Sequence, residues 1–395
     1  MTLFGYGVTN QAIARRFGGC KIFDDKFISP SVDEWGNELL PTYMFDSDSS
    51  EVEIVTPGIP PSHPLIKNAR NLMSEYDFFS SKLGFNIWVS GTNGKTSTTE
   101  MITHLLAKWG AKSGGNIGTP LADMGEAKIK VLETSSFSMH YTKVAKPNIY
   151  VLLPITPDHL SWHGSFEEYE MAKLSVLGRM EEGEAILLPA KYKDIDSDGY
   201  KICYEEAGDL AEFFGIDVEK IEHKEPFLLN AILALGVSKI LFDEVDYELI
   251  NSYKIGEHRV EELYDRLGRL WVDDSKATNA NATSAALKRY KERKIHLIFG
   301  GDDKGASLEE AFEVLKSMDA TLYLIGSNIH RSRELCQKNR IEFKECETIE
   351  RAVTTIDLEH DKSSVALLSP AAASLDQFSS YKQRGERFKE LVLIL

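Results

Sequence analysis

The stretch Ser90-Gly91-Thr92-Asn93-Gly94-Lys95-Thr96-Ser97 decides how the middle of this chain folds. It follows the apolar run 87–89 and precedes the helical pattern 99–106, so a glycine-rich turn joins a strand to a helix. In this arrangement backbone N–H groups and a helix N-terminus face an anion, Lys95 reaches the phosphates and the Thr96 hydroxyl ligates Mg²⁺. Val89 stands where the usual loop has its first glycine. The flanking strand and helix nevertheless favour a nucleotide site over a surface turn.

Length and composition describe an ordinary globular chain. Its 395 residues, of which 43% are hydrophobic and 27% charged, suffice for two or three domains. The longest apolar runs, such as 149–153, are far too short to cross a bilayer, and residues 1–5 lack a signal-peptide pattern. The four cysteines show neither paired nor zinc-type spacing: Cys20, Cys203, Cys336 and Cys346. These features predict a cytoplasmic protein with no membrane partner.

The net charge of −16 restricts the ligands. Non-specific nucleic-acid binding needs a basic face, so we expect no nucleic-acid partner. If the ligands are phosphates and carboxylates, an acidic protein must hold them with local cations, helix N-termini and Mg²⁺. The few well-placed Lys and Arg residues are therefore the candidates for binding.

The first of three blocks, residues 1–83, begins like a dinucleotide-type fold. A strand at 2–4 leads into Gly5-Tyr6-Gly7, a helix at 10–17 and a second strand at 21–23 that ends in an acidic pair. Asn10 occupies the third glycine position, so this motif alone is weak. A later strand at 53–55 ends in a Pro-Gly turn.

The other two blocks, residues 84–255 and 256–395, alternate strands with helices. The second has strands at 131–132 and 149–153, and the third has strands at 270–272, 295–299, 321–325 and 365–368. This alternation predicts parallel sheets with crossover helices. We expect an α/β protein of three domains: a Rossmann-like N-terminal domain, a central P-loop ATPase-like domain with a mainly parallel sheet, and a Rossmann-like C-terminal α/β domain.

Polar residues follow several strands, and ligands of open α/β sheets bind at these carboxyl ends. In the second block Glu133 follows a strand and suits a metal ligand, although its Glu-Thr-Ser-Ser segment could instead cap a helix. His159 follows the next strand, and its alternative is an exposed loop histidine. Lys173 lies on a predicted helix at 166–177, where a lysine is usually solvated. Strand ends of the third block offer glycines, hydroxyls and lysines at 273–279, 300–305 and 369–378, which suits anionic ligands better than hydride chemistry.

Together these segments resemble the Mur ligase family, ATP-dependent amide-bond ligases that build the peptidoglycan stem peptide. The resemblance spans nearly the whole chain and rests on these motifs: Gly91 to Thr96, Gly115-Asn116-Ile117-Gly118, Glu133 to Ser136, Pro157-Asp158-His159 with Lys173, Asn230, and His258-Arg259. The third-block segments 274–279, 300–304 and 368–378 are most similar to members that add D-glutamate to UDP-N-acetylmuramoyl-L-alanine. The Asp-Asn-Pro-Arg signature of a sister enzyme is absent.

The resemblance implies a role for each block and each motif. Residues 1–83 would bind the UDP substrate, 84–255 would bind ATP, and 256–395 would bind the amino acid. The implied ATP contacts are Gly91, Thr92, Asn93, Gly94, Lys95, Thr96, Ser97, Asn230, Arg259, Asp274 and Lys276. The implied catalytic residues are Lys95, Glu133, His159 and Lys173, and the implied ligands of two Mg²⁺ ions are Thr96, Glu133, His159 and Lys173, the last as a carbamylated lysine. The implied UDP-substrate contacts are Val8, Thr9, Asp24, Asp25, Asn116 and His159, and the implied D-glutamate contacts are Thr278, Lys304, Ser374, Leu375 and Tyr381.

Two positions depart from the family pattern, and several alternatives remain. Asp25-Lys26 replaces a common Thr-Arg in the uracil loop, and Pro226-Phe227 replaces a His-Asn pair near the adenine. The alternatives are a Mur-type ligase for another amino acid, an NAD-dependent oxidoreductase based on Gly5 and Asp24, and a non-catalytic nucleotide-binding regulator. The oxidoreductase leaves the Lys95-Thr96 loop and the third domain unexplained, and the filled catalytic positions disfavour the regulator. We expect a monomer.

Overall fold

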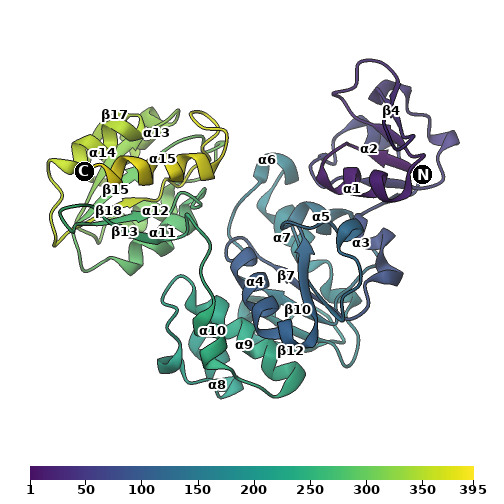
Figure 1. Ribbon diagram of the computed structural model, residues 1–395, viewed down its shortest axis with the longest axis horizontal. Helices are drawn as coiled ribbons and strands as arrows, with labels where there is room; N and C mark the ends of the chain where they lie inside the picture. Colours follow the sequence, from purple (N-terminus) through teal and green to yellow (C-terminus); the bar gives the residue numbers. More distant parts are fainter. The chain divides into compact units, whose positions relative to one another are not determined.

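A computed structural model describes residues 1–395, which divide into two compact units. The first comprises residues 1–223 and 227–253, and the second comprises 224–226 and 254–395. No helix is both long enough and apolar enough to cross a membrane. Three six-stranded sheets, two in the first unit and one in the second, confirm the α/β class with three sheet-containing domains (Figure 1).

The first sheet has the strand order β3-β4-β2-β1-β5-β6 and is parallel except for the β3–β4 pair. Its elements are β1 Thr2–Phe4, α1 Val8–Phe17, β2 Lys21–Phe23, β3 Ser31–Val32, β4 Glu38–Leu40, β5 Glu53–Val55, α2 Pro64–Asn68, β6 Leu72–Met73 and α3 Glu75–Phe78. The predicted strands 2–4, 21–23 and 53–55 are confirmed, and the predicted helix begins two residues early, at Val8.

The second sheet is parallel throughout, with the order β12-β11-β10-β7-β9-β8. Its elements are β7 Asn86–Ser90, α4 Lys95–Leu106, β8 Ala111–Gly115, β9 Ile129–Glu133, α5 Ser136–Tyr141, β10 Ile149–Leu152, α6 Leu160–His163, α7 Phe166–Leu174, β11 Ala185–Pro189, β12 Tyr200–Tyr204, α8 Ala207–Phe214, α9 Leu228–Phe242 and α10 Tyr247–Ser252. The helix predicted to reach residue 177 ends at Leu174, and a separate 3₁₀ turn covers Leu177–Arg179. Central strands β7, β9 and β10 are fully buried, as expected for a parallel sheet covered on both faces.

The third sheet has the order β13-β14-β18-β15-β16-β17, and its only antiparallel pair is β13–β14. Its elements are β13 Glu261–Tyr264, β14 Leu270–Asp273, α11 Ala280–Arg289, β15 Ile295–Phe299, α12 Glu309–Leu315, β16 Ala320–Ile325, α13 Ile329–Asn339, β17 Glu342–Glu347, α14 Ile349–Asp357, β18 Val365–Leu368 and α15 Tyr381–Leu393. All four strands predicted in this block are present. Because β14, β18 and β15 are adjacent and parallel, their carboxyl ends meet at one edge of the sheet.

Candidate active site

The phosphate-loop segment joins β7 to α4, as the sequence predicts. Val89 is fully buried within β7, so the turn begins at Gly91 and not at the position of the missing glycine. Gly91 has φ +135°, and a Cβ there would lie 2.5 Å from the Leu153 Cβ on the neighbouring strand end. Gly94, with φ +84°, caps α4, and Lys95 is the first helical residue. The loop therefore presents a helix N-terminus at the carboxyl edge of the sheet.

Glu133 lies beside this loop at the end of β9. Its Oε2 accepts a hydrogen bond of 2.8 Å from the Thr96 hydroxyl, and its Oε1 accepts one of 2.7 Å from the Asn116 amide. The helix-capping alternative is confirmed for Ser135 of this segment, which caps α5 by accepting from the Ser138 N–H. It does not apply to the Glu133 carboxylate, which bonds Thr96 instead. Two predicted site residues from different segments, Thr96 and Asn116, thus meet around the buried carboxylate of a third, Glu133.

Lys173 is buried, so the alternative of a solvated lysine is wrong. Its side chain is 1% exposed, and Nζ donates a 2.7 Å hydrogen bond to the Gly91 carbonyl of the phosphate loop. Nζ also lies 4.7 Å from the centre of the Tyr169 ring. Burial, reinforced by neighbouring Lys95, lowers the pKa of the Lys173 ammonium well below its usual range.

His159 occupies a left-handed position (φ +53°) before α6, and its side chain is 48% exposed. Its ring packs edge-to-face on Phe137, with 4.7 Å between centroids. It is the exposed loop histidine that the alternative described, but exposure at this edge leaves it accessible to a ligand.

Sequence reasoning missed a polar cluster of Thr92, Thr156 and Tyr169 that holds the phosphate loop in place. The Thr92 and Tyr169 hydroxyls share a hydrogen bond of 2.9 Å, and the Thr92 hydroxyl donates to the Thr156 carbonyl at 3.0 Å. Tyr169 precedes Lys173 by one helical turn, and this spacing was the available signal. The cluster orients both the loop and the lysine.

The predicted uridine-substrate residues lie around the first turn of the first sheet. Val8 is exposed and Thr9 is half-buried at the start of α1. Asp24 Oδ2 accepts a 2.6 Å hydrogen bond from the Tyr6 N–H, and Asp25 accepts from Thr42 and contacts His63. Asn10 fills the third glycine position because its buried amide donates to the carbonyls of Phe4, Gly5 and Ile54.

The predicted ATP residues are divided between the two units. Asn230 lies in the first, where a Cβ on Gly94 would be 2.9 Å from its Oδ1. Arg259, Asp274 and Lys276 lie in the second, around the end of β14. Asp274 accepts a 2.7 Å hydrogen bond from the Ser369 hydroxyl and a 3.2 Å bond from the Val260 N–H. Burial raises its pKa to about 8.

The predicted amino-acid residues gather at the same edge of the third sheet. Asp302 and Ala373 exchange backbone hydrogen bonds of 3.0 and 2.9 Å, which ties the loop of exposed Lys304 to that of buried Ser374. Leu375 is exposed, Thr278 is exposed after β14, and the half-buried Tyr381 ring lies 4.1 Å from Lys276 Nζ.

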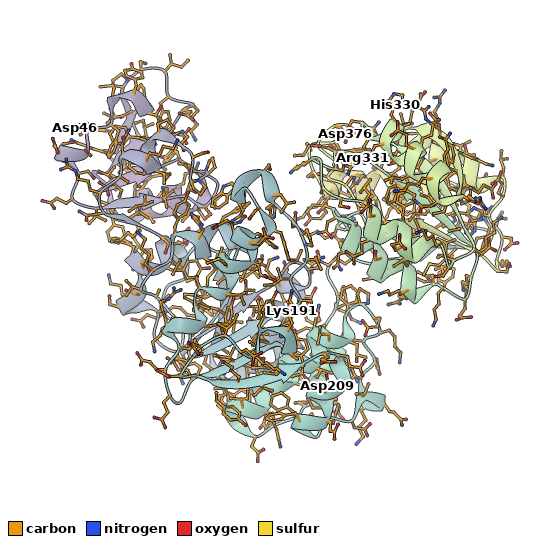
Figure 2. The ribbon with its side chains drawn as sticks, turned by 180° about the vertical axis from the view of Figure 1, so that it is seen from behind. Asp46, Lys191, Asp209, His330, Arg331 and Asp376 are labelled. Atoms are coloured by element: carbon orange, nitrogen blue, oxygen red, sulfur yellow. The ribbon has the colours of Figure 1, made fainter.

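The neighbouring loops brace this edge. The Ser327 N–H donates to Asp376 at 2.7 Å, and Arg331 on α13 pairs with Asp303 at 3.0 Å. Both Arg331 and Asp376 belong to this unit and are labelled in Figure 2.

Arg384 on α15 was also missed. It is 1% exposed, and its guanidinium donates to the Ser275 hydroxyl (2.9 Å), the Ser275 carbonyl (2.8 Å) and the Ala372 carbonyl (3.1 Å). It therefore joins two of the predicted loops. The available signal was a cation in the buried 384-388-392 stripe of the helix.

Comparison with known proteins identifies the class. Residues 89–207 match the Mur ligase middle domain, and residues 258–372 match the Mur ligase glutamate ligase domain. The chain is similar in fold to the MurF ligase of Thermotoga maritima in complex with ADP (TM-score 0.61, 18% identity, 99% of this chain and 97% of that one). It is also similar to the UDP-N-acetylmuramate-alanine ligase MurC of Thermotoga maritima (TM-score 0.58, 14% identity, 98% of each).

Two relatives in sequence are more informative. The chain is 52% identical to UDP-N-acetylmuramoylalanine--D-glutamate ligase of Campylobacter jejuni strain 81-176, over 99% of each chain. It is 45% identical to the enzyme of the same name from Helicobacter pylori strain 26695, over 100% of this chain and 99% of the relative. The chain belongs to the Mur ligase family. Membership removes the reason for taking Gly5-Tyr6-Gly7 as part of an NAD-dependent oxidoreductase.

Proposed function

We propose that this protein is an ATP-dependent ligase that joins D-glutamate to UDP-N-acetylmuramoyl-L-alanine, releasing ADP and phosphate, in peptidoglycan precursor synthesis. The observation that carries the proposal is 52% identity to the Campylobacter jejuni ligase over 99% of both chains. Similarity over the whole length supports the same substrates and disfavours a Mur-type ligase for another amino acid. The proposed roles of the blocks are UDP-substrate binding for 1–83, ATP binding for 84–255 and amino-acid binding for 256–395.

The proposed ATP contacts are the loop Gly91–Ser97 and Asn230 in the first unit, and Arg259, Asp274 and Lys276 in the second. The proposed Mg²⁺ ligands are Thr96, Glu133, His159 and carbamylated Lys173. Glu133 suits a hard cation because both its oxygens already accept hydrogen bonds from uncharged groups. Bound Mg²⁺ would neutralise charge on the transferring phosphoryl group.

Carbamylation of Lys173 is supported by its burial. The reaction needs a neutral amine, and the lowered pKa of this lysine increases the neutral fraction. The amine nitrogen attacks the carbon of CO₂, an N–C bond forms while one C=O π bond breaks and its electron pair moves to oxygen, and one proton leaves to solvent. The product, a carbamate, carries a negative charge. Together with the Glu133 carboxylate, this charge would favour binding of a cation.

The proposed reaction has two steps, both of which build negative charge. A carboxylate oxygen of the muramoyl-alanine attacks the γ-phosphorus of ATP, ADP leaves, and an acyl phosphate forms. The neutral amine of D-glutamate then attacks the acyl carbon. Phosphate leaves from the tetrahedral intermediate with the electron pair of the broken C–O bond, and it takes up the proton that the nitrogen loses. Lys95 in the phosphate loop is the proposed catalytic cation for the first step, because it begins a helix aimed at the phosphates.

Substrate selection is assigned to two further groups of residues. D-glutamate carries two carboxylates, so its site needs a cation and fixed donors. We assign these to Thr278, Lys304, Ser374, Leu375 and Tyr381, with Leu375 and Tyr381 acting through backbone groups. We assign the UDP substrate to Val8, Thr9, Asp24, Asp25, Asn116 and His159. We also propose a cytoplasmic monomer without nucleic-acid or membrane partners, in keeping with the net charge of −16.

Phosphate release tests the function. Purified protein is given ATP, Mg²⁺ and UDP-N-acetylmuramoyl-L-alanine with D-glutamate, L-glutamate, D-aspartate, L-alanine, L-lysine or meso-diaminopimelate in turn. Release is expected with D-glutamate alone, and reactions without the UDP substrate are the control. Preference for another amino acid would overturn the D-glutamate assignment, and no release with any amino acid would overturn the ligase.

A further inference from the structure

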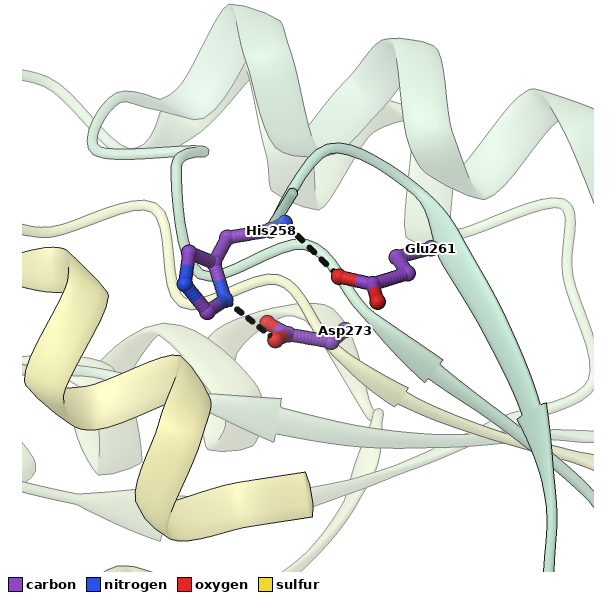
Figure 3. A group of neighbouring side chains, drawn as sticks. All are labelled: His258, Glu261 and Asp273. Atoms are coloured by element: carbon purple, nitrogen blue, oxygen red, sulfur yellow. Dashed lines mark hydrogen bonds and ion pairs between the residues drawn. The ribbon is translucent and has the colours of Figure 1, made fainter. Parts of the chain in front are cut away.

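A buried imidazole–carboxylate pair lies at the base of the proposed nucleotide segment of the second unit. His258 is 1% exposed and Asp273 is fully buried, and 2.6 Å separates Nδ1 from Asp273 Oδ2 (Figure 3). Because a carboxylate only accepts, Nδ1 carries the shared hydrogen. Nε2 is buried without a partner. Neither ring nitrogen is open to a ligand, so His258 does not act by contacting substrate.

The same group could be taken for a metal site, since one ligand atom each from His258, Glu261 and Asp273 lies within 4.8 Å of the others. The bonds already formed argue against this. Nδ1 is engaged by Asp273, and Glu261 accepts from the His258 N–H at 3.0 Å and from Lys389 at 3.2 Å. The cluster is a hydrogen-bonded scaffold in which Nδ1 and the Glu261 carboxylate are already engaged.

This scaffold holds the residues on both sides of Arg259 in an unfavourable, left-handed backbone conformation. His258 has φ +63° and Val260 has φ +49°, and the left-handed region is unusual for a β-branched residue. Three bonds hold these two residues besides the imidazole pair. The His258 N–H donates to Glu261, the His258 carbonyl accepts from the Lys276 N–H at 3.1 Å, and the Val260 N–H donates to Asp274 at 3.2 Å.

Helix α15 packs against the His258–Asp273 pair through Gly385. A Cβ on Gly385 would lie 2.2 Å from His258 Nδ1 and 2.7 Å from Asp273 Oδ2, so only glycine leaves room for the pair. The adjacent Arg384 holds Ser275, and the Ser275 N–H donates to Asp273 Oδ1 at 3.0 Å. The pair is thus confined by the helix, the end of β14 and its own segment.

We propose that the His258–Asp273 pair, confined beneath Gly385, positions Arg259 to bind the nucleotide. The inference rests on the proposed function, which makes Arg259 an ATP contact. His258, Asp273 and Gly385 are positioning residues whose effect on nucleotide affinity passes through Arg259. Loss of the pair leaves the Arg259 side chain intact. It frees the left-handed backbone at residues 258 and 260, which sets the direction of that side chain.

A double-mutant cycle on Mg-ADP affinity, measured by calorimetry on the full-length chain, tests the inference. Arg259→Ala removes one charge-assisted contact and is expected to raise the Kd about tenfold, with His258→Ala and Gly385→Ala each raising it several-fold. In the Arg259→Ala background the same two changes are expected to alter the Kd less than about twofold. If His258→Ala fails to fold, Asp273→Asn takes its place in the cycle, because the amide keeps the shape of the carboxylate but removes its charge.

Gly208→Ala is the matched control, because this helical glycine in α8 has no atom closer than 3.8 Å to an added Cβ. It should leave the Kd unchanged. Equal weakening by His258→Ala in both backgrounds, or no effect of Arg259→Ala, would overturn the positioning role. A wild-type protein that neither binds Mg-ADP nor releases phosphate would instead overturn the proposed function.

Discussion

Lys173 and Arg384 are both cations with 1% exposure, one in each compact unit, and their surroundings differ in a way that bears on chemistry. Lys173 donates to a single carbonyl, that of Gly91, and faces the Tyr169 ring. Arg384 donates to three oxygens on Ser275 and Ala372. The lysine is poorly satisfied as a cation, whereas the arginine is held as one.

The difference shows how burial separates a reactive group from a structural one. Burial lowers the pKa of Lys173 well below its usual range, so a larger fraction of the amine is neutral and nucleophilic. Burial also lowers the pKa of Arg384, but only to about 10, so the guanidinium stays charged at neutral pH. We therefore assign covalent modification to the first and loop bracing to the second.

The largest effect is expected at Lys173. Lys173→Ala and Lys173→Arg should each lower kcat by on the order of 100-fold or more, because neither can form a carbamate to hold a metal. Formate or acetate should partly restore Lys173→Ala by filling the vacated space, but should not restore Lys173→Arg. Exposed Lys191, paired with Glu170, provides the control Lys191→Ala. Full activity of Lys173→Arg would show that a permanent positive charge suffices at this position, as at Arg384. That result would contradict the assignment of a carbamate.

The next largest effect is expected at Arg384, the buried cation with a structural role. Arg384→Ala should raise the KM for D-glutamate on the order of 10- to 100-fold, because it releases the Ser275 and Ala372 loops. Arg384→Lys keeps the charge and should recover part of the loss, unlike Arg at position 173. Arg387→Ala on the same helix is the control. A change in kcat alone, with the KM for D-glutamate intact, would show that Arg384 does not brace the amino-acid loops.

Lys304, exposed and close to the loop that Arg384 holds, should have a smaller effect. Lys304→Ala is expected to raise the KM for D-glutamate about tenfold, the loss of one charge-assisted contact, and to leave the KM for ATP nearly unchanged. Lys316→Ala, which removes an exposed lysine paired with Glu313, serves as the control. Steady-state kinetics decide the point, since equal rises in both KM values would place Lys304 outside the amino-acid site.

The last prediction concerns Asp274, a buried carboxyl close to Arg384. Its pKa is raised to about 8 from 3.8, so the folded chain binds this proton more tightly than the unfolded chain. Raising the pH from about 4 to 8 should therefore lower the free energy of unfolding, by at most about 1.4 kcal/mol per pH unit. Asp274→Asn should lose less Tm than wild type between pH 6 and pH 8 by calorimetry. Parallel pH profiles of the two proteins would refute the raised pKa.

The sequence predicted the parts of the molecule that depend on local pattern. The loop Gly91–Thr96 was recognisable because its glycines lie between an apolar strand and a periodic helix. The strand ends of the third block were recognisable for the same reason. Edge strand β8 was not, because Ala111–Gly115 carries two glycines and little apolar character.

Contacts between distant segments could not be predicted in this way. The His258–Asp273 bond joins residues 15 apart, and the Arg384–Ser275 bond joins residues 109 apart. Lys173 was also ambiguous, because acidic residues 167, 168 and 170 make α7 look solvated although the lysine faces inward. Its role came from family resemblance, and its burial came from the tertiary packing of α7 against the phosphate loop.

The formation of an acyl phosphate is the central claim, and isotope transfer tests it most directly. UDP-N-acetylmuramoyl-L-alanine labelled with ¹⁸O in its carboxylate is incubated with the protein, ATP, Mg²⁺ and D-glutamate, and the released phosphate is analysed by mass spectrometry. One carboxylate oxygen should appear in each phosphate, because the C–O bond to phosphorus breaks when the amine attacks the acyl carbon. Unlabelled phosphate formed together with labelled amide product would contradict the account.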